Sequence, residues 1–161
     1  MRRGWLVSQG YAAPDGLAIM GGSYGGYAAL MGAVKTPDRY QCAISVNGVT
    51  DLPDFLRSML NYVGGRFGTR FIGNLWKDRS QLAARSPARN ADQVNIPILL
   101  LHGEKDRVVP ISQSNKMSRA LKSAGKSVRY VKLEEGDHSI SLYGNRVRFL
   151  QEVEAFLADC L

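Results

Sequence analysis

The chain has 161 residues, of which 45% are hydrophobic and 22% charged, which predicts one globular domain and excludes a disordered or fibrous chain. Its apolar stretches are far shorter than the ~20 residues of a membrane span, and no signal-peptide core follows Met1-Arg2-Arg3. The formal net charge is +7, but the basic residues are interleaved with acidic and apolar ones, so we expect neither a nucleic-acid partner nor a membrane partner.

The N-terminal residues predict a short helix, a turn and a strand. Within residues 1–10, the apolar run Trp5-Leu6-Val7 has polar neighbours, as in a short helix. Pro14-Asp15-Gly16 is typical of a turn, and the apolar run Leu17–Met20 predicts the first strand of a sheet.

A glycine-flanked serine follows this strand. The segment Gly21-Gly22-Ser23-Tyr24-Gly25 matches G-x-S-x-G, a pattern in which a serine lies on a tight strand-to-helix turn with an exposed hydroxyl. We expect Gly21 and Gly25 to lie where the backbone leaves no room for a Cβ. The residues of Tyr27–Val34 predict the following helix, which Pro37 ends, and the N–H groups at its start can stabilise an oxyanion.

Two other glycine-rich motifs do not fit this segment. A phosphate-binding loop requires a lysine directly after its last glycine, and none is present. The dinucleotide-binding pattern G-x-G-x-x-G is not matched in any register. We therefore interpret the segment as a nucleophile turn.

Residues 41–95 predict a buried strand followed by an irregular region. Gln41–Val46 is short and largely apolar, as expected of a strand that is buried on both faces of a parallel sheet. Residues 47–95 have poor periodicity and predict helices joined by loops. The aromatic residues of this region are expected to pack in the core rather than to line a substrate pocket: Phe55, Tyr62, Phe67, Phe71 and Trp76.

The last part of the chain predicts two more strands, Ile96–Leu101 and Val128–Leu133, and two helices. The helix at residues 112–124 has one apolar stripe, formed by Met117, Ala120, Leu121 and Ala124. The final helix, residues 147–161, has a stripe that should cover the sheet, formed by Phe149, Leu150, Val153, Phe156 and Leu157. Strands that alternate with helices predict a parallel sheet with helices on both faces, in which ligands collect at the carboxyl ends of the strands.

Three chemically active side chains directly follow predicted strands. Ser23 follows the first strand, Asp106 lies in the turn after the third, and His138 follows the fourth. A serine hydroxyl needs a base to become a nucleophile, and a histidine base needs a carboxylate that fixes its tautomer. The chain order serine, aspartate, histidine is that of α/β-hydrolases. The sequence therefore predicts a serine hydrolase, whose chemistry needs no metal and no cofactor.

Other residues compete for the roles of base and acid. The chain has two histidines, and we interpret His102, which closes the third strand, as structural. Glu104 and Asp137 compete with Asp106 for the role of the acid. Glu104 lies in the first half of the turn, and Asp137 adjoins the histidine along the chain, where a side chain rarely faces its neighbour.

The two cysteines are far apart in the sequence. Cys42 lies in a predicted strand and Cys160 is the penultimate residue, a spacing typical of neither a metal site nor a disulfide framework. We therefore expect free thiols in a reducing compartment, and hence a cytoplasmic location.

Four motifs together carry a resemblance to a known family: Gly21-Gly22-Ser23-Tyr24-Gly25-Gly26-Tyr27, Ser86-Pro87 leading to Pro97, His102-Gly103-x-x-Asp106-x-x-Val109-Pro110, and Gly136-Asp137-His138. The chain resembles the C-terminal catalytic domain of prolyl oligopeptidase-type serine peptidases, and most closely their acylaminoacyl-peptidase and dipeptidyl-peptidase branch. The resemblance covers nearly the whole chain and implies an α/β-hydrolase fold. It also implies the site residues: Ser23 as nucleophile, Asp106 as orienting acid, His138 as base, and the backbone N–H of Tyr24 as one half of the oxyanion hole.

The resemblance further implies parts that this sequence does not contain. Family members carry a β-propeller, and their hydrolase domain begins with several strands before the nucleophile, whereas about sixteen residues precede the first strand here. We therefore expect residues 1–161 to form a single truncated α/β-hydrolase domain with the second half of the sheet. Its first strand would be an unpaired edge, so we expect a homo-oligomer.

The expected function is hydrolysis of peptide or ester bonds through an acyl-enzyme intermediate at Ser23. One alternative is a carboxylesterase that acts on small acyl esters. Another is a truncated, weakly active or inactive module that self-associates, because the missing part includes the loop that donates the second oxyanion-hole group. Loss of one such donor can lower the rate by roughly 10²–10³.

Overall fold

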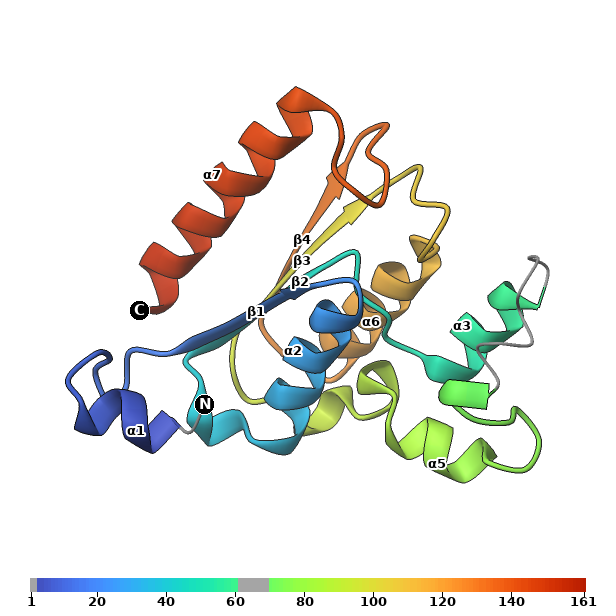
Figure 1. The fold of residues 1–161 in the computed structure, drawn as a ribbon, viewed down its shortest axis with the longest axis horizontal. Helices are drawn as coiled ribbons and strands as arrows, with labels where there is room; N and C mark the ends of the chain where they lie inside the picture. Colours follow the sequence, from blue (N-terminus) through green and yellow to red (C-terminus); the bar gives the residue numbers. More distant parts are fainter. Residues whose placement is uncertain (1–2, 61–69) are drawn as a thin grey trace.

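The computed structural model describes residues 3–60 and 70–161. Its centre is a parallel sheet of four strands that lie side by side in chain order (Figure 1). The strands are β1 (Ala18–Gly22), β2 (Cys42–Val46), β3 (Ile98–Gly103) and β4 (Val128–Leu133). All four predicted strands are confirmed, although β3 begins two residues later than expected because Pro97 supplies only a carbonyl, to Ala43, at its start.

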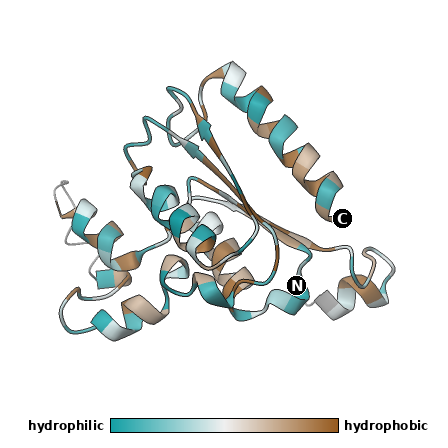
Figure 2. Ribbon diagram, turned by 180° about the vertical axis from the view of Figure 1, so that it is seen from behind, coloured by the Kyte–Doolittle hydropathy of each residue, from teal (hydrophilic) through white to brown (hydrophobic). Residues whose placement is uncertain are grey.

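The two inner strands form the core of the molecule. Every residue of β2 and β3 is buried, whereas β1 and β4 alternate between buried or half-buried and exposed residues. Figure 2 shows hydrophobic residues along the strands of the sheet. Both faces of β2 and β3 are therefore covered, as the apolar runs in the sequence predict.

Helices cover both faces of the sheet. Helices α2 (Tyr24–Lys35) and α6 (Ser112–Ser123) lie on one face, and α7 (Tyr143–Cys160) lies on the other (Figure 1). Parallel strands in chain order with right-handed connections place all the connecting helices on one face, so only the helix after β4 covers the other. Two of the hydrophobic clusters reflect this division, because Leu30 and Met117 belong to one and Phe156 belongs to the other.

Helix α7 packs along the sheet through most of its predicted stripe. Phe156 is buried, and Phe149, Val153 and Leu157 pack against the same cluster, whereas Leu150 is 61% exposed. Leu150 lies about 100° around the helix from Phe149 and so at the margin of the stripe, just beyond Leu157. Within the described part of the chain, no helix is both long and apolar enough to cross a membrane.

The cysteine expectation was wrong. A disulfide joins Cys42, the first residue of β2, to Cys160, the last residue of α7. Because α7 runs back across the sheet, its C-terminal end reaches the strand end where Cys42 lies. The pairing spans 118 residues and depends on tertiary packing, so no local spacing could reveal it.

The region after β2 consists of short helices, as predicted. It contains α3 (Leu52–Met59), α5 (Arg79–Ala84) and 3-10 turns at Pro87–Arg89 and Ala91–Gln93. A 3-10 turn at Pro37–Arg39 follows α2, and α1 (Arg3–Ser8) precedes the sheet.

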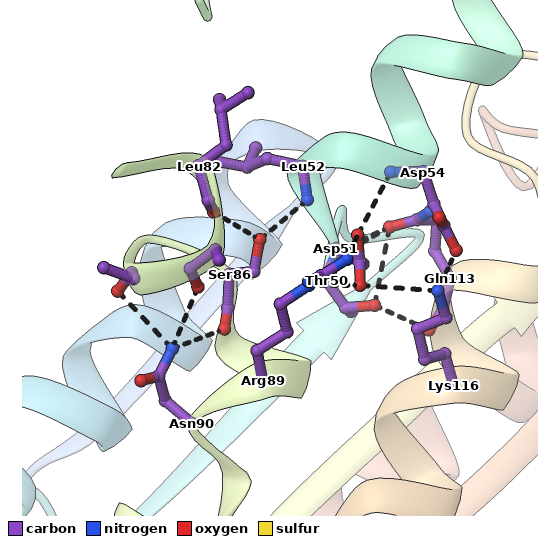
Figure 3. A network of polar contacts seen from close by, with 12 residues as sticks. Thr50, Asp51, Leu52, Asp54, Leu82, Ser86, Arg89, Asn90, Gln113 and Lys116 are labelled. Atoms are coloured by element: carbon purple, nitrogen blue, oxygen red, sulfur yellow. Dashed lines mark hydrogen bonds and ion pairs between the residues drawn. The ribbon is translucent and has the colours of Figure 1, made fainter. Parts of the chain in front are cut away.

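A network of buried polar contacts fixes the start of α3 (Figure 3). The side-chain oxygen of Gln113 accepts hydrogen bonds from the amides of Thr50 and Asp51, at 2.9 and 2.8 Å. The Asp51 carboxylate caps α3 through the Asp54 amide and also pairs with Arg89 at 2.9 Å. These contacts hold the beginning of α3 against α6 and the turn after α5.

Candidate active site

Ser23 forms the turn between β1 and α2 by itself. The strand ends at Gly22 and the helix begins at Tyr24, three residues earlier than predicted. Ser23 has a φ of 55° and a ψ of −119°, and its amide donates to the carbonyl of Val46 at 2.8 Å. A positive φ is unfavourable for a residue with a Cβ, and such strain occurs often at functional sites.

The flanking glycines have unequal steric roles. A Cβ on Gly21 would lie 2.3 Å from the carbonyl carbon of Gly25, so the turn closes only with glycine at that position. A Cβ on Gly25 would meet no atom within 4 Å, which corrects the expectation that both glycines leave no room for a side chain. Gly26 is the second crowded position, because its Cβ would lie 2.7 Å from the Ser45 hydroxyl.

Asp106 is paired with His138. Nδ1 of His138 lies 2.7 Å from one carboxylate oxygen of Asp106, although the two residues are 32 positions apart. The other carboxylate oxygen accepts hydrogen bonds from the amides of Val108 and Val109, at 2.8 and 2.9 Å. The Asp106 side chain is fully buried, so these bonds fix both of its oxygens.

The surroundings of Asp106 favour its ionised form. Burial by itself would raise the pKa of this carboxyl, because a charge is poorly solvated there. The rings of His102 and His138 and the two backbone amides oppose burial, and together they lower the pKa to about 2. Asp106 is therefore a carboxylate at neutral pH.

His102 lies beneath this loop, where it was expected. It is fully buried, with Nδ1 2.7 Å from the Ser114 hydroxyl and Nε2 2.9 Å from the carbonyl of Val109. A carbonyl can only accept, so Nε2 carries the proton and Nδ1 accepts from Ser114. Because both ring nitrogens have partners, His102 has no free nitrogen for a substrate.

The two competing acids lie elsewhere. Glu104 is exposed. Asp137 accepts hydrogen bonds from the amide and hydroxyl of Ser141, which hold the pKa of Asp137 below its usual range. Neither carboxylate is hydrogen-bonded to His138. Within residues 3–60 and 70–161, no three metal-ligating side chains gather into a metal site.

Asn47 joins the loops that carry the acid and the base. It directly follows β2, is buried, and has a φ of 49°. Its amide nitrogen donates to the carbonyl of His138 at 2.8 Å, and its side-chain oxygen accepts from the amide of Gly103 at 2.9 Å. The sequence interpretation missed this residue, although its position directly after a strand was a usable signal.

Gly103 permits the same two loops to approach each other. A Cβ at this position would lie 2.4 Å from the carbonyl oxygen of Gly136 and 2.7 Å from that of Asp137. The amide of Lys105 also donates to Gly136 at 2.8 Å. The absence of a side chain at Gly103 therefore lets the turn that bears Asp106 lie against the loop that bears His138.

The structure brings Asp106 and His138 into contact and leaves Ser23 separate. Among the described residues, no hydrogen bond joins the Ser23 hydroxyl to His138. Ser23 nevertheless lies at the carboxyl end of β1, and the other two residues follow β3 and β4. All three therefore lie on the side of the sheet formed by the carboxyl ends of the strands. Tyr24 is the first residue of α2, where backbone N–H groups lack helical partners.

A cavity of about 260 Å³ opens beside Ser23. It is lined mostly by apolar and aromatic side chains: Tyr24, Tyr27, Val49, Leu52, Phe55, Phe71, Ile72, Val108 and Val109, together with Arg85.

The expected core packing of the aromatic residues is confirmed for Phe55 and is wrong for Phe71 and Trp76, which are exposed. Phe55 and Phe71 line the cavity, and Phe55 also packs against the neighbouring core cluster. Trp76 is 87% exposed and packs in no core. Tyr62 and Phe67 lie outside the described residues.

Comparisons with known proteins identify the family of this chain and its structural neighbours. The model of the prolyl oligopeptidase family matches residues 3–161. Dipeptidyl aminopeptidase BIII of Pseudoxanthomonas mexicana is 34% identical over 161 residues, and the human acylamino-acid-releasing enzyme is 30% identical over 136. The structure of a Mycobacterium tuberculosis puromycin-hydrolyzing peptidase superposes with a TM-score of 0.90 at 34% identity. The sheet and helices are therefore part of an α/β-hydrolase fold, as predicted.

The chain corresponds to one part of these relatives. The alignment with dipeptidyl aminopeptidase BIII covers 98% of this chain and 23% of the relative. The corresponding values are 78% and 18% for the human enzyme, and 99% and 24% for the M. tuberculosis structure. The chain thus spans about a quarter or less of the length of the proteins that it matches.

Proposed function

Because the chain belongs to the prolyl oligopeptidase family, we propose that it is the catalytic part of a serine peptidase with Ser23, Asp106 and His138 as its triad. The observation that carries this proposal is the contact between His138 and the buried Asp106 carboxylate at the sheet edge where Ser23 occupies a strained turn. The named relatives are peptidases, which favours peptide bonds as substrates.

In the proposed first step, His138 activates Ser23. The Asp106 carboxylate accepts from Nδ1 of His138, so the proton resides on Nδ1 and Nε2 is free to accept one. Nε2 removes the proton from the Ser23 hydroxyl as the oxygen attacks the substrate carbonyl carbon. The imidazolium that forms is stabilised by Asp106, whose low pKa keeps it charged.

The attack of Ser23 forms a tetrahedral intermediate with a negatively charged oxygen. The products then leave in two stages, the amine first and the acid second. The Tyr24 amide at the start of α2 donates to the oxyanion, and the imidazolium of His138 gives its proton to the leaving amine as the C–N bond breaks. A water molecule, deprotonated by His138, next attacks the acyl-enzyme. This attack forms a second tetrahedral intermediate. When that intermediate collapses, the carboxylic acid leaves and His138 returns the proton to the Ser23 oxygen.

The test of this proposal is reaction with a fluorophosphonate followed by intact-mass analysis. The unmodified chain should gain one adduct, the Ser23→Ala variant should gain none, and Ser80→Ala, at an exposed serine of α5, should react like the unmodified chain. A folded chain that gains no adduct, or an adduct that persists in Ser23→Ala, would refute the proposed nucleophile.

Ester hydrolysis is the second candidate reaction. The favouring observation is the apolar cavity of about 260 Å³, which can hold the acyl chain of a small ester. Turnover of an aminoacyl-nitroanilide should be compared with that of a short-chain nitrophenyl ester. Hydrolysis of the ester without hydrolysis of the anilide would favour a carboxylesterase.

The outer strand β1 supports a further part of the proposal, namely that copies of this chain associate with one another. Within the described residues, β1 pairs only with β2, and Met20 on β1 is 46% exposed. An exposed strand edge can pair with another chain. We therefore expect homo-oligomers of this chain. A monomer mass that is independent of concentration in light scattering would exclude them.

A further inference from the structure

Among the described residues that line the cavity beside Ser23, one side chain is charged. The described lining of the cavity is apolar or aromatic apart from the Ser23 hydroxyl, the phenols of Tyr24 and Tyr27, and the guanidinium of Arg85. Arg85 is the residue that caps the C-terminal end of α5. A cation at the edge of an apolar cavity is a means of selecting a ligand by charge.

No carboxylate in the described part of the chain neutralises Arg85. Among the described residues, its guanidinium makes no ion pair and no hydrogen bond, whereas Arg89, four positions later, pairs with Asp51 at 2.9 Å. Residues 1–2 and 61–69 contain neither aspartate nor glutamate, so they supply no side-chain carboxylate. The charge of Arg85 is therefore available to a ligand.

The positive charge of Arg85 influences Tyr27, a residue that lines the cavity. Burial raises the pKa of Tyr27, the neighbouring phenol of Tyr24 raises it further, and the positive charge of Arg85 opposes them. This influence requires the guanidinium to lie near the Tyr27 phenol, on the cavity side of α5. Arg85 is otherwise exposed, so it can reorient toward a bound group.

The cavity lies on the acyl side of the proposed nucleophile. A leaving amine must lie next to His138, which protonates it. His138 does not line the cavity, whereas Ser23 and Tyr24 do. The residue that becomes attached to Ser23 is therefore the one whose side chain enters the cavity.

Resting on the proposed function and on the position of the cavity on the acyl side of Ser23, we propose that Arg85 makes this cavity select an acidic side chain, glutamate in particular. The methylene groups of glutamate pack against the apolar wall formed by Leu52 and Val109, and its carboxylate reaches Arg85 at the rim. A volume of about 260 Å³ is small for a whole ligand, since such sites commonly measure ~300–1,000 Å³, and it suits one side chain.

Glutamate and glutamine provide the matched pair of ligands. They have the same shape and differ in charge, and a carboxylate held by a guanidinium gains a charge-assisted hydrogen bond that an amide lacks. Because Arg85 is exposed, solvent screens the pair, and we expect a preference of about tenfold rather than several hundredfold. The preference should decrease at high salt.

The first measurement is binding, which does not depend on catalysis. The full chain with Ser23→Ala is titrated with acetyl-glutamyl-methylamide and with acetyl-glutaminyl-methylamide, and the dissociation constants are compared by NMR. The glutamyl probe should bind about tenfold more tightly. Equal affinities, tighter binding of the glutaminyl probe, or no detectable binding of either probe would overturn the proposal.

Variants assign the preference to Arg85. In the Ser23→Ala background, Arg85→Met should abolish the preference by weakening the glutamyl probe alone, and Arg85→Lys should retain part of it. Arg79→Met, which removes the same charge from an exposed position at the other end of α5, should retain all of it. A preference that survives Arg85→Met, or that is lost equally in Arg79→Met, would show that the net charge of the chain causes it.

Hydrolysis by the unmodified chain separates this inference from the proposed function. Glutamyl and glutaminyl aminomethylcoumarins should be cleaved with kcat/KM values that differ about tenfold. Cleavage of both at equal rates would refute the role of Arg85 and leave the peptidase intact. Selective binding of the glutamyl probe without any cleavage would refute the peptidase and support the selectivity of the cavity.

Discussion

The candidate nucleophile and the candidate acid–base pair are held by different kinds of structure. Ser23 lies after the edge strand β1, in a turn whose shape depends on the close approach of Gly21 to Gly25. Asp106 and His138 lie in loops after β3 and β4, and Asn47 binds the second loop from 91 positions away in the chain. The nucleophile is thus fixed by local backbone geometry, and the pair is fixed by long-range hydrogen bonds.

This difference has a consequence for robustness. A local turn can be destroyed by one methyl group in the wrong place, because its atoms have no room to relax. The loops that carry Asp106 and His138, joined by Asn47 and here called the junction, are held by several separate hydrogen bonds. A single substitution there removes only some of these bonds, so it should loosen the site and leave the fold intact. The following substitutions separate the two cases.

The largest effect is expected for Gly21→Ala. The added Cβ would lie 2.3 Å from the carbonyl group of Gly25, so the turn must open, and we expect a loss of roughly 4–5 kcal/mol of stability. Labelling by fluorophosphonate should be lost as well. Thermal unfolding and intact mass are the measurements.

Gly25→Ala is the matched control for that substitution. Its Cβ meets no atom within 4 Å, and alanine favours the helix by about 1 kcal/mol over glycine, so stability should be unchanged or higher. If Gly25→Ala were as damaging as Gly21→Ala, local crowding at Gly21 would not be the reason for the motif.

Reduction of the Cys42–Cys160 disulfide tests whether the fold can lose stability without any change at the nucleophile, because the bond lies at the opposite end of the strands. The bond closes a loop with a sequence separation of 118, and its loss should lower the stability by about 4 kcal/mol. Because Cys42 lies at the amino end of β2, the rate of fluorophosphonate labelling should not change while the chain stays folded. Urea unfolding with and without a phosphine reductant tests this, with Cys160→Ser as a second route. Two free thiols per unreduced chain would contradict the disulfide.

Asn47→Gly should loosen the acid–base pair. Glycine tolerates the φ of 49° at this position, so the substitution removes the side-chain bonds without adding backbone strain. The buried amide of Gly103 loses its partner, which should cost about 2–3 kcal/mol of stability, and His138 becomes less well placed. We expect kcat to decrease about tenfold with little change in KM.

Asn145→Ala is the control for the junction. Asn145 also donates to a backbone carbonyl, that of Glu134 at 2.9 Å, but this bond is exposed and holds the first residue of the loop rather than His138 itself. Its loss should change neither kcat nor KM. If Asn47→Gly lowered kcat and raised KM to a similar extent, the whole site would be loosened, and misplacement of His138 would not be the cause.

The same division explains what the sequence could and could not predict. The turn at Ser23 depends on consecutive residues, so a five-residue motif located it, and the positions of the four strands along the chain followed from the apolar runs. His102 was correctly interpreted as structural because it closes a buried strand. Asn47, by contrast, acts through partners brought to it by β3 and β4, and nothing in its immediate neighbours specifies them. Cys42 and Cys160 were misinterpreted for the same reason.

The smallest expected effect concerns the pH dependence of the junction. The pKa of Asp106 is lowered to about 2 from a usual value of 3.8, so the folded state binds this proton less readily than the unfolded state. The resulting stabilisation, about 2 kcal/mol, is fully present above pH ~4 and is lost as the pH falls toward 2.

Asp106→Asn isolates this contribution from the other acids that titrate in the same range. Asparagine cannot ionise, so the stability of the wild type should exceed that of the variant by about 2 kcal/mol at pH 6 and approach it near pH 2. Urea unfolding at several pH values measures both curves. A gap that stays constant between pH ~6 and ~2 would mean that the long-range bond to His138 and the local bond from the Val109 amide do not favour the charged carboxylate. The hydrogen bonds of Asp106 would then not be what fixes the acid–base pair, and the contrast with the locally fixed nucleophile would fail.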